Sequence, residues 1–290
     1  MKIAILSLDE SLYSTRRLME AGQQRGHTMR ILHTLKCYME ISRQGPVIFY
    51  EGKKLPRFDA VIPRIGSSIT TYGLMILRQF ELLGTITANK VAGIALARDK
   101  WGSLQHMAHH QIPIPHSGLV RDFDYTEQMI AQLGGPPIIL KLLEGSQGKG
   151  VMLLENLTTA RGVTDTLRTL YQDFLLQEYI AESKGADIRC FIINGQPVAA
   201  MKRQAPAGEF RSNLHRGGKA VKIRLTPQEK TLSISAATTF GLDVAGIDLL
   251  RSARGPLVME VNASPGLEGI EQCTGVDVAA KMIELLEMRR

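Results

Sequence analysis

Residues 245–262 read AGIDLLRSARGPLVMEVN, in which two apolar segments flank a short turn that contains Arg, Gly and Pro. This pattern predicts a β-hairpin, and a hairpin centred on Arg254 places Asp248 opposite Glu260. Asn262 lies two residues beyond Glu260, so its side chain points to the same face of the sheet. Three oxygen-donating side chains therefore gather on one patch of an otherwise apolar hairpin.

The two facing carboxylates of this hairpin need a compensating positive charge. Like charges directly opposite each other destabilise a sheet by roughly 0.2–1 kcal/mol even when they are exposed. Mg²⁺ prefers oxygen ligands and is commonly held by one or two carboxylates together with substrate phosphates. The residues alone leave open that Asp248 and Glu260 simply face solvent, so a magnesium–nucleotide site is a hypothesis at this point.

The composition is that of a globular protein. Of the 290 residues, 44% are hydrophobic and 22% are charged, which predicts two or three compact units and no extensive disorder. No apolar run approaches the roughly 20 residues that a transmembrane helix needs. The three cysteines are far apart and form no CxxC pair, which favours a reducing cytoplasm over a disulfide framework.

Most of the net charge of +7 lies between Val198 and Arg224, where seven basic side chains stand against Glu209 alone. Such a field attracts an anion, for which nucleotide phosphates, an acidic substrate and nucleic acid are the candidates. Because Phe210 is the only aromatic residue of this stretch, single-stranded nucleic acid is the least favoured of the three.

Apolar periodicity divides the chain into an α/β part and a β-rich part. Strand-like and helix-like segments alternate in the N-terminal third, which predicts a small open α/β domain with a parallel sheet. A second helical region is expected next, over Ala92–His110, and β-strands dominate from Asp187 on. The other predicted elements are Ile3–Ser7, Leu12–Gly26, Met29–His33, Ala60–Pro63, Tyr72–Leu83, Pro136–Leu143, Val151–Leu154, Thr158–Tyr171, Leu175–Ile180, Ile188–Ile193, Pro197–Arg203, Pro227–Phe240, Val244–Leu250, Leu257–Val261 and Val276–Met288.

Seven motifs occur in the order in which one known family has them. They are ARDK at Ala97–Lys100, LKLLEGSQGKGV at Leu140–Val151, QEYI at Gln177–Ile180, GADIRC at Gly185–Cys190, FRSNLHRGG at Phe210–Gly218, DVAGIDLL at Asp243–Leu250 and MEVNASPGLEGIE at Met259–Glu271. On these motifs the chain resembles the ATP-grasp enzymes, and specifically the RimK family of glutamate ligases. The resemblance implies an ATP-grasp fold of mixed α/β and α+β class. It comprises an N-terminal open α/β pre-ATP-grasp domain (1–95), a central ATP-grasp subdomain (96–177) and a C-terminal one (178–290).

The resemblance also implies a reaction. A substrate carboxylate attacks the γ-phosphate of ATP to give an acyl phosphate and ADP, and an amine then forms the amide. In the RimK family the amine is that of L-glutamate, and the carboxylate is the C-terminus of the sixth protein of the small ribosomal subunit; the family is also linked to poly-α-glutamate synthesis. Two Mg²⁺ ions, with Mn²⁺ as a substitute, and a homotetramer in the cytoplasm are implied as well, with no membrane and no nucleic acid as partner.

Two lysines and a glycine-rich loop are implied to hold the ATP phosphates. Lys141 lies mid-strand between apolar neighbours, where a charge is uncommon without a partner. Lys100 stands at a helix start, where a phosphate would compensate the helix dipole. The loop acts through backbone N–H groups; a plain surface lysine and an ordinary hairpin turn are the alternatives. The loop residues are Gly145, Ser146, Gly148 and Gly150, and Lys149 departs from the apolar residue that family members often have there.

The nucleoside is implied to lie against the segment 178–189. Glu178 and Tyr179 resemble the hinge whose backbone binds adenine, with an ordinary strand end as the alternative. Asp187 resembles the ribose-binding carboxylate. Arg189 lies two residues further on the same strand face, and its alternative role is that of partner to a core carboxylate.

Arg203 is the candidate for contact with the transferring phosphoryl group, because a guanidinium can donate two hydrogen bonds to phosphoryl oxygens. The metal ions fall to Asp248, Glu260 and Asn262. By resemblance, Arg211, Ser212 and Asn213 contact ATP, and the acceptor pocket or acyl phosphate falls to His215, Arg216, Gly217, Gly218, Ser264 and Gly266. A solvated basic turn is the alternative for the 211–218 loop.

Other functions remain open from the sequence. One is a related ATP-grasp ligase with a small-molecule or carrier-protein acceptor, as in lysine and arginine biosynthesis or cofactor glutamylation. Another is a basic nucleic-acid-binding module with no ATP turnover, which would bind RNA in a salt-sensitive way. Helical spacing of His106, His109 and His110 is compatible with zinc, but no HExxH accompanies it and a solvated helix face is favoured.

Overall fold

An open parallel sheet forms the N-terminal unit of the computed structural model, which describes residues 1–145, 149–214 and 217–290. The strand order is β2-β1-β6-β7, and the central strand β1 is almost fully buried, as expected when helices cover both faces of a parallel sheet. The elements are β1 (Lys2–Ser7), α1 (Tyr13–Gln24), β2 (Thr28–His33), β6 (Ala60–Pro63), α2 (Thr70–Leu82) and β7 (Ile86–Thr87). The predicted α/β class is confirmed.

The sequence pattern does not predict the small antiparallel sheet that follows β2. It consists of β3 (Cys37–Ser42), β4 (Gly45–Tyr50) and β5 (Lys53–Lys54). The strands carry apolar residues on both faces, since Ile48 is buried whereas Ile41 is 72% exposed, so the period of two that marks a half-buried strand is weak.

The helical region predicted over Ala92–His110 is confirmed, but it is divided into two helices. The chain forms α3 (Val91–Arg98) and α4 (Lys100–His109), which are separated by Asp99 in an extended conformation. The Asp99 carboxylate accepts hydrogen bonds from the backbone N–H groups of Trp101 and Gly102 at 3.1 and 2.9 Å. A capping aspartate thus outweighs continuous apolar periodicity, and the break sets Arg98 and Lys100 on either side of it.

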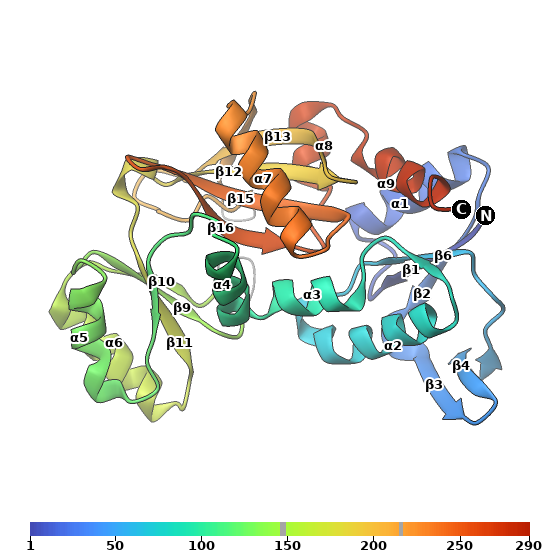
Figure 1. The fold of residues 1–290 in the computed structure, drawn as a ribbon, viewed down its shortest axis with the longest axis horizontal. Helices are drawn as coiled ribbons and strands as arrows, with labels where there is room; N and C mark the ends of the chain where they lie inside the picture. The colour runs from blue at the N-terminus through green and yellow to red at the C-terminus, as the bar shows by residue number, and fades with distance from the viewer. Residues whose placement is uncertain (146–148, 215–216) are drawn as a thin grey trace.

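The central unit is an antiparallel sheet of order β10-β9-β11-β8 with its own hydrophobic core. Figure 1 shows its two helices, α5 and α6, together at one end of the molecule. Its elements are β8 (Ser117–Leu119), α5 (Thr126–Gln132), β9 (Ile138–Leu142), β10 (Val151–Leu154), α6 (Leu157–Thr169) and β11 (Phe174–Glu178).

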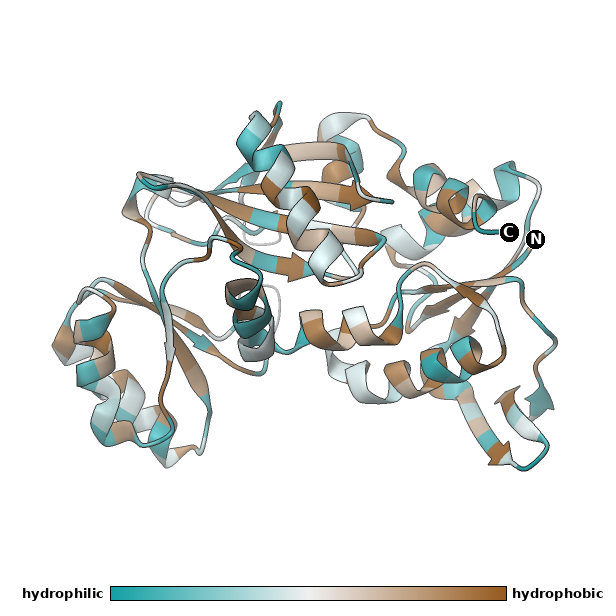
Figure 2. Cartoon of the chain, viewed as in Figure 1, coloured by the Kyte–Doolittle hydropathy of each residue, from teal (hydrophilic) through white to brown (hydrophobic). Residues whose placement is uncertain are grey.

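The C-terminal unit is an antiparallel sheet of order β14-β13-β12-β15-β16. Figure 2 shows mainly hydrophobic strands in it, interrupted by hydrophilic positions. Helix α7 packs on β12, β13, β15 and β16, while α8 contacts β13 and β14. The elements are β12 (Ala186–Ile193), β13 (Gln196–Gln204), β14 (Lys219–Lys222), α7 (Pro227–Thr239), β15 (Val244–Ser252), β16 (Gly255–Asn262), α8 (Glu268–Thr274) and α9 (Val278–Glu287).

Two of these elements are missing from the sequence-based expectations. The edge strand β14 is short, basic and largely exposed, so it has no apolar pattern. Helix α8 has only seven residues and ends at Gly275, whose φ of 71° favours glycine. The last helix consequently begins at Val278 and not at the predicted Val276.

The register of the β15–β16 hairpin agrees with the prediction for a reason that the sequence pattern does not contain. Asp248 pairs with Glu260, as expected. The turn, however, is the two-residue 253–254, because Ser252 pairs with Gly255, and a regular ladder from that turn would set Asp248 opposite Met259. A bulge between Asp248 and Leu249 supplies the missing shift.

The N-terminal unit is fixed to the C-terminal sheet by the buried side chain of Asn89. Its Nδ2 donates to the carbonyls of Val244 and Ala263 at 2.7 and 2.9 Å, and its Oδ1 accepts from the backbone N–H groups of Asp243 and Val244 at 2.9 Å each. The junction of the two units is therefore well defined. In the described part of the chain, no helix has the length and apolarity to cross a membrane.

Candidate active site

Charged residues form a row across the sheet of the C-terminal unit. Interstrand pairing sets Asp187 of β12 opposite Arg203 of β13, and Arg189 of β12 opposite Asp248 of β15. Asp248 is in turn opposite Glu260 of β16. Since residues two apart point to the same face of a strand, all five side chains share one face. The apolar residues between them, such as Ile188 and Leu249, are buried beneath the other face.

Four members of this row, Asp187, Arg189, Arg203 and Asp248, bind one another and are called the paired group below. Arg203 donates from Nε and Nη2 to Asp187 at 2.6 and 2.8 Å, and its Nη2 is 3.0 Å from Oδ2 of Asp248. Arg189 forks onto Asp248 through Nε and Nη2, the latter at 2.6 Å. Two carboxylates and two guanidinium groups thus balance in charge.

Burial makes this mutual pairing necessary. Asp187, Arg203 and Asp248 are each at most 5% exposed, and a buried ion without a partner costs several kcal/mol. Burial by itself would raise the pKa of Asp248, but Arg189 and Arg203 lower it overall. The same guanidinium groups occupy both oxygens of Asp248, so a cation at this carboxylate competes with Arg203.

Three cations lie near enough to Glu260, the last member of the row, for its charge to act on them. Lys141 lies on β9, Lys100 at the start of α4 and Arg98 at the end of α3. Burial lowers the pKa of each of them, to about 8 for Lys141, while the charge of Glu260 raises it. Glu260 itself is exposed. The central unit and the C-terminal sheet therefore face each other across opposite charges.

These three cations donate to neutral oxygens. Lys141 Nζ donates to Oε1 of Gln177 at 2.7 Å. Lys100 Nζ donates to the carbonyls of Leu143 and Gly145 at 2.7 and 3.0 Å, which brings it to the first residue of the glycine-rich loop. In the described residues, no carboxylate lies within salt-bridge distance of either lysine. Both ammonium groups are available to an anion.

The glycine-rich loop is described at its two ends. Gly150 has a φ of 72°, and a Cβ there would lie 2.9 Å from the Leu142 side chain, so the hairpin closes only over glycine. The backbone N–H of Leu142 donates to the Gly150 carbonyl at 2.8 Å. Ser146 and Gly148 lie outside the described residues.

The three predicted metal ligands are brought to one end of the hairpin. Glu260 is opposite Asp248, and Asn262 is opposite Gly246, two residues away on the partner strand. In the described residues no group of three His, Cys, Asp or Glu side chains gathers as a metal site. The oxygen donors nevertheless fit Mg²⁺, which takes few protein ligands and completes its shell with water and phosphate oxygens.

The predicted adenine hinge contacts the turn of the hairpin. Arg254 forks onto the Glu178 carboxylate, with Nη1 3.1 Å from Oε2, and the backbone N–H of His116 donates to Oε1 at 2.6 Å. Burial would raise the pKa of Glu178, but these hydrogen bonds lower it. The Glu178 side chain is thus bonded within the protein, and Tyr179 beside it is half-buried. That their backbone binds adenine stays a prediction.

Arg211 and Ser212 connect the 209–218 loop to both subdomains. Arg211 donates to Glu209 at 2.7 Å and to the Val151 carbonyl of β10 at 3.2 Å. The Ser212 hydroxyl is hydrogen-bonded to Asp187. Asn213 follows, half-buried. The loop therefore extends the paired group towards the glycine-rich hairpin.

The other end of this loop depends on glycine. A Cβ on Gly218 would lie 2.5 Å from the Ser212 carbonyl oxygen, a distance that backbone atoms cannot tolerate. Gly217 has a φ of 84°. His215 and Arg216, predicted for the acceptor pocket, lie outside the described residues.

The segment after the metal strand reaches the N-terminal unit. The Ser264 hydroxyl donates to the Pro63 carbonyl, which ends β6, at 3.4 Å. Gly266 follows two residues later, with open space where a Cβ would be. The Ser264 side chain is thus hydrogen-bonded to the N-terminal unit, and its role in binding the acceptor stays a prediction.

Of the three clustered histidines, His106 packs against the end of α7. His106 Nε2 lies 2.9 Å from the Thr239 carbonyl, and its ring packs edge-on against Phe240 at 4.8 Å. His109 and His110 are exposed. This arrangement serves the contact between α4 and α7.

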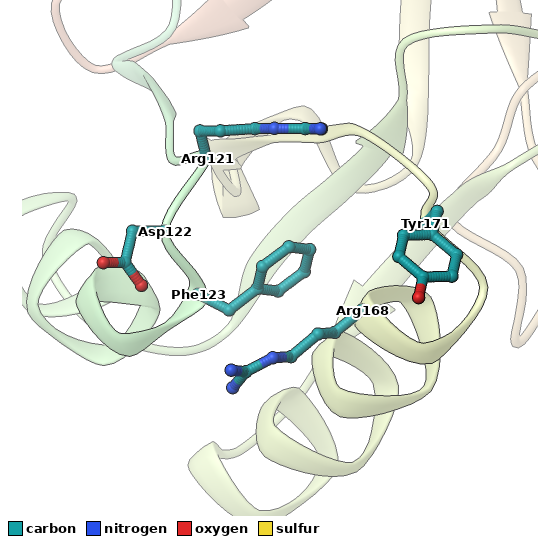
Figure 3. A pocket seen from close by; sticks show the side chains of 5 residues that line it. All are labelled: Arg121, Asp122, Phe123, Arg168 and Tyr171. Carbon is teal, nitrogen blue, oxygen red and sulfur yellow. The ribbon is translucent and has the colours of Figure 1, made fainter.

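Two surface hollows lie apart from the charged row. One, of about 250 Å³, is confined to the central unit (Figure 3). The other, of about 590 Å³, lies beside the start of α7. Neither is lined by a predicted site residue. The first is lined by Arg121, Asp122, Phe123, Arg168 and Tyr171.

Comparison with known proteins accounts for the whole chain. The RimK pre-ATP-grasp domain matches residues 1–94, and the RimK-like ATP-grasp domain matches residues 97–286. The chain belongs to the RimK family of ATP-grasp ligases. It is therefore an ATP-dependent ligase, and the fold and family that the motifs imply are confirmed.

Relatives of this family match over nearly their full length. The chain is 55% identical over 287 residues to the ribosomal protein bS6–L-glutamate ligase of Salmonella paratyphi B, covering 99% of this chain and 96% of that protein. It is 54% identical over 289 residues to a probable α-L-glutamate ligase of Serratia proteamaculans, covering 100% and 96%.

Among solved structures, the ATP-grasp ligase PsnB with its minimal precursor superposes with a TM-score of 0.79 at 21% identity, covering 100% of this chain and 99% of that one. A RimK domain protein from Sphaerobacter thermophilus gives 0.75 at 20% identity, covering 99% and 100%. These similarities extend the fold assignment to the arrangement of all three units.

Proposed function

We propose that this ligase joins L-glutamate to the C-terminus of ribosomal protein bS6, and that it extends the product to oligo-α-glutamate. The observation that carries the chemistry concerns Lys100, Lys141 and Arg98. They are three cations that feel the charge of Glu260 but have no carboxylate at bonding distance in the described residues. A nucleoside triphosphate supplies the missing negative charge. The acceptor is proposed from the length-wide 55% identity to a relative that bears this name.

The residues divide the work between binding and charge stabilisation. Lys100 and Lys141 bind phosphate oxygens, and Arg203 is placed to fork onto the transferring phosphoryl group once ATP draws it from the paired group. The hinge at Glu178 and Tyr179 offers backbone groups to adenine, and Asp187 is the candidate for the ribose. No protein nucleophile is needed, since the substrate carboxylate attacks the γ-phosphate itself.

Asp248, Glu260 and Asn262 would hold two Mg²⁺ ions. Bound there, the ions would neutralise the developing charge on the phosphoryl oxygens. The residues themselves contribute orientation: Arg189 keeps the Asp248 carboxylate facing the row, and the bulge next to Asp248 keeps Glu260 opposite it. Arg189 is accordingly proposed as a positioning residue and not as a direct ATP ligand.

Incubation with ATP, Mg²⁺, L-glutamate and bS6 tests this proposal. The expected result is ADP release together with mass increments of whole glutamate residues on the bS6 C-terminus. An acceptor of another kind, such as a small acid or a carrier protein that is strictly required for ADP release, would contradict it. Replacement of L-glutamate by other amino acids in parallel reactions establishes the donor.

Two finer features are proposed with this function. Mn²⁺ is expected to substitute for Mg²⁺, because both ions accept an all-oxygen ligand set. A homotetramer is expected, which sedimentation or light scattering on the purified chain measures directly. The cytoplasm, where bS6 is made, is the proposed location.

A further inference from the structure

Arg64 occupies the position at which open α/β sheets bind their ligands. It directly follows β6, and its backbone N–H donates to the Leu6 carbonyl at the end of β1, at 2.8 Å. In the order β2-β1-β6-β7, the chain leaves β1 towards one side and returns on the other, so the carboxyl ends of β1 and β6 flank the switch point of the sheet. Ligands of such sheets bind outside the strand ends at this point.

The side chain of Arg64 is half-buried, and it lies near a second half-buried guanidinium, that of Arg98. Burial, followed by the nearby charge of Arg98, lowers the pKa of Arg64 to about 10. Arg98 donates from Nη2 to the Ile65 carbonyl at 2.7 Å, which anchors it beside the strand end. Across residues 1–145, 149–214 and 217–290, no carboxylate lies within salt-bridge distance of Arg64 or Arg98.

Two adjacent, half-buried cations without a carboxylate partner are unfavourable in the free protein. Each loses hydration, and each repels the other. The paired group shows how this chain treats buried guanidinium groups elsewhere, since Arg203 has two carboxylates and Arg189 has one. Arg64 and Arg98, by contrast, have no carboxylate partner in the described residues, which is expected where a bound anion provides the negative charge.

The pair is also close to the site where the bond is made. Pro63, the residue before Arg64, accepts the hydrogen bond of Ser264, two residues beyond Asn262. Arg98 feels the charge of Glu260 and is separated from the phosphate-binding Lys100 by Asp99 alone. Asn89 fixes this junction. An anion held by the pair therefore lies beside the metal strand, on the side of the N-terminal unit.

We propose that Arg64 and Arg98 bind a substrate carboxylate that does not itself react. This inference rests on the proposed function, in which both substrates are carboxylic acids. Free L-glutamate brings two carboxylates that take no part in the bond, and a glutamate at the acceptor C-terminus brings its side-chain carboxylate. Arginine suits either group, because its planar donors match the two carboxylate oxygens.

Arg64→Met tests the site, because methionine keeps the apolar length of the side chain and removes the charge. We expect the KM for one carboxylate substrate to rise roughly 10- to 100-fold, the usual effect of losing a charge-assisted hydrogen bond pair, with the KM for ATP unchanged. The Tm should stay the same or rise, because the repulsion with Arg98 is relieved. Arg78→Met, at an exposed position of α2, is the matched control.

The two arms of the measurement identify the source of the carboxylate. A raised KM for L-glutamate assigns the site to the incoming amino acid, and a raised KM for a bS6 C-terminal peptide assigns it to the acceptor. Arg64→Lys, which keeps the charge but loses the fork, should fall between wild type and Arg64→Met. If the wild type is active and Arg64→Met has unchanged KM values for both substrates, the carboxylate site is refuted and the proposed function stands. If the wild type does not join L-glutamate to bS6, the proposed function itself is refuted.

Discussion

Two groups of charges lie close together in this molecule and differ in their partners. In the paired group (Asp187, Arg189, Arg203 and Asp248), each charge is bonded to an opposite charge within the protein. The cationic group, formed by Arg64, Arg98, Lys100 and Lys141, has no carboxylate at bonding distance in the described residues. The charges of Glu260, and also of Glu144 for Lys100 and Asp248 for Lys141, act on three of its members from further away. Its hydrogen bonds go to neutral oxygens where they are described.

Members of both groups are proposed to bind ATP or its metal ions, but only the paired group is neutralised within the protein when these ligands are absent. The paired group satisfies itself, so it should contribute to the fold in the absence of substrates. The cationic group remains positive until ATP and carboxylic acids bind. The unfavourable free energy of its mutual repulsion is then relieved and adds to the affinity for these anions. Removal of a charge from the first group should therefore cost stability of the ligand-free protein as well as activity, whereas removal of a charge from the second should cost ligand affinity or turnover alone.

Asp248→Asn is expected to cause the largest loss in the free energy of unfolding. It leaves the buried guanidinium groups of Arg189 and Arg203 without their shared carboxylate, and removal of one partner from a buried ion pair costs roughly 3–5 kcal/mol. Urea unfolding of the ligand-free chain measures the effect. Asp173→Asn, which breaks the exposed pair with Arg121, should cost roughly 0–1 kcal/mol. Equal losses in the two variants would show that the paired group is not structural.

Glu260→Gln should lower turnover and leave the free energy of unfolding unchanged. Its carboxylate is exposed and has no ion pair in the described residues, so the free energy of unfolding should be unchanged. Turnover should fall by roughly 10²–10³-fold, the usual effect of losing one electrostatic stabiliser of a transition state. ADP release under saturating ATP and Mg²⁺ is the measurement, with the exposed Glu155→Gln as control. Near-normal ADP release would refute the assignment of Glu260 to the metal.

The sequence predicts the hairpin and its facing carboxylates because both strands and their turn are contiguous. The partners of those carboxylates are not contiguous: Arg189 meets Asp248 only through the pairing of β12 with β15. Even the predicted register depends on a bulge that no residue pattern announces. Local periodicity therefore indicates which side chains share a face, and interstrand pairing determines which of them neutralise each other.

Arg64 and Arg98 show the same limit for the cationic group. They are separated along the chain by the whole of α2 and α3, and the switch point of the N-terminal sheet together with the break at Asp99 brings them together. The sequence contains a usable signal in the arginine that directly follows the apolar strand Ala60–Pro63. Without the strand order, that position cannot be distinguished from an ordinary surface turn.

Gly218→Ala should disturb the paired group indirectly, through the loop that carries Ser212. The new methyl would overlap the Ser212 carbonyl oxygen, so the loop must shift and the hydrogen bond of Ser212 to Asp187 is lost. We expect a loss of roughly 1–3 kcal/mol in the free energy of unfolding, as for other overpacked sites. Gly162→Ala in α6, where a Cβ meets open space, should instead stabilise by roughly 0.5–1 kcal/mol. A stable Gly218→Ala would argue that the loop does not bear on the paired group.

The smallest effect tests whether the cationic group is held in readiness for an anion. Burial lowers the pKa of Lys141 to about 8 from its usual 10.5, so at pH 8 its amine is about half protonated. Phosphate oxygens favour the charged form, so ATP binding should take up roughly half a proton at pH 8, and ATP affinity should fall as the pH rises above this value. Because the unfolded chain binds more protons than the folded one between about pH 8 and 10.5, the ligand-free protein should gain stability over the same window.

Calorimetric titration with ATP in buffers of different ionisation enthalpy measures the proton uptake. Lys141→Met should abolish this uptake, while Lys149→Met, in the exposed loop, should not. Proton uptake that persists in Lys141→Met would place the titrating group elsewhere and leave Lys141 as an ordinary charged lysine before ATP arrives.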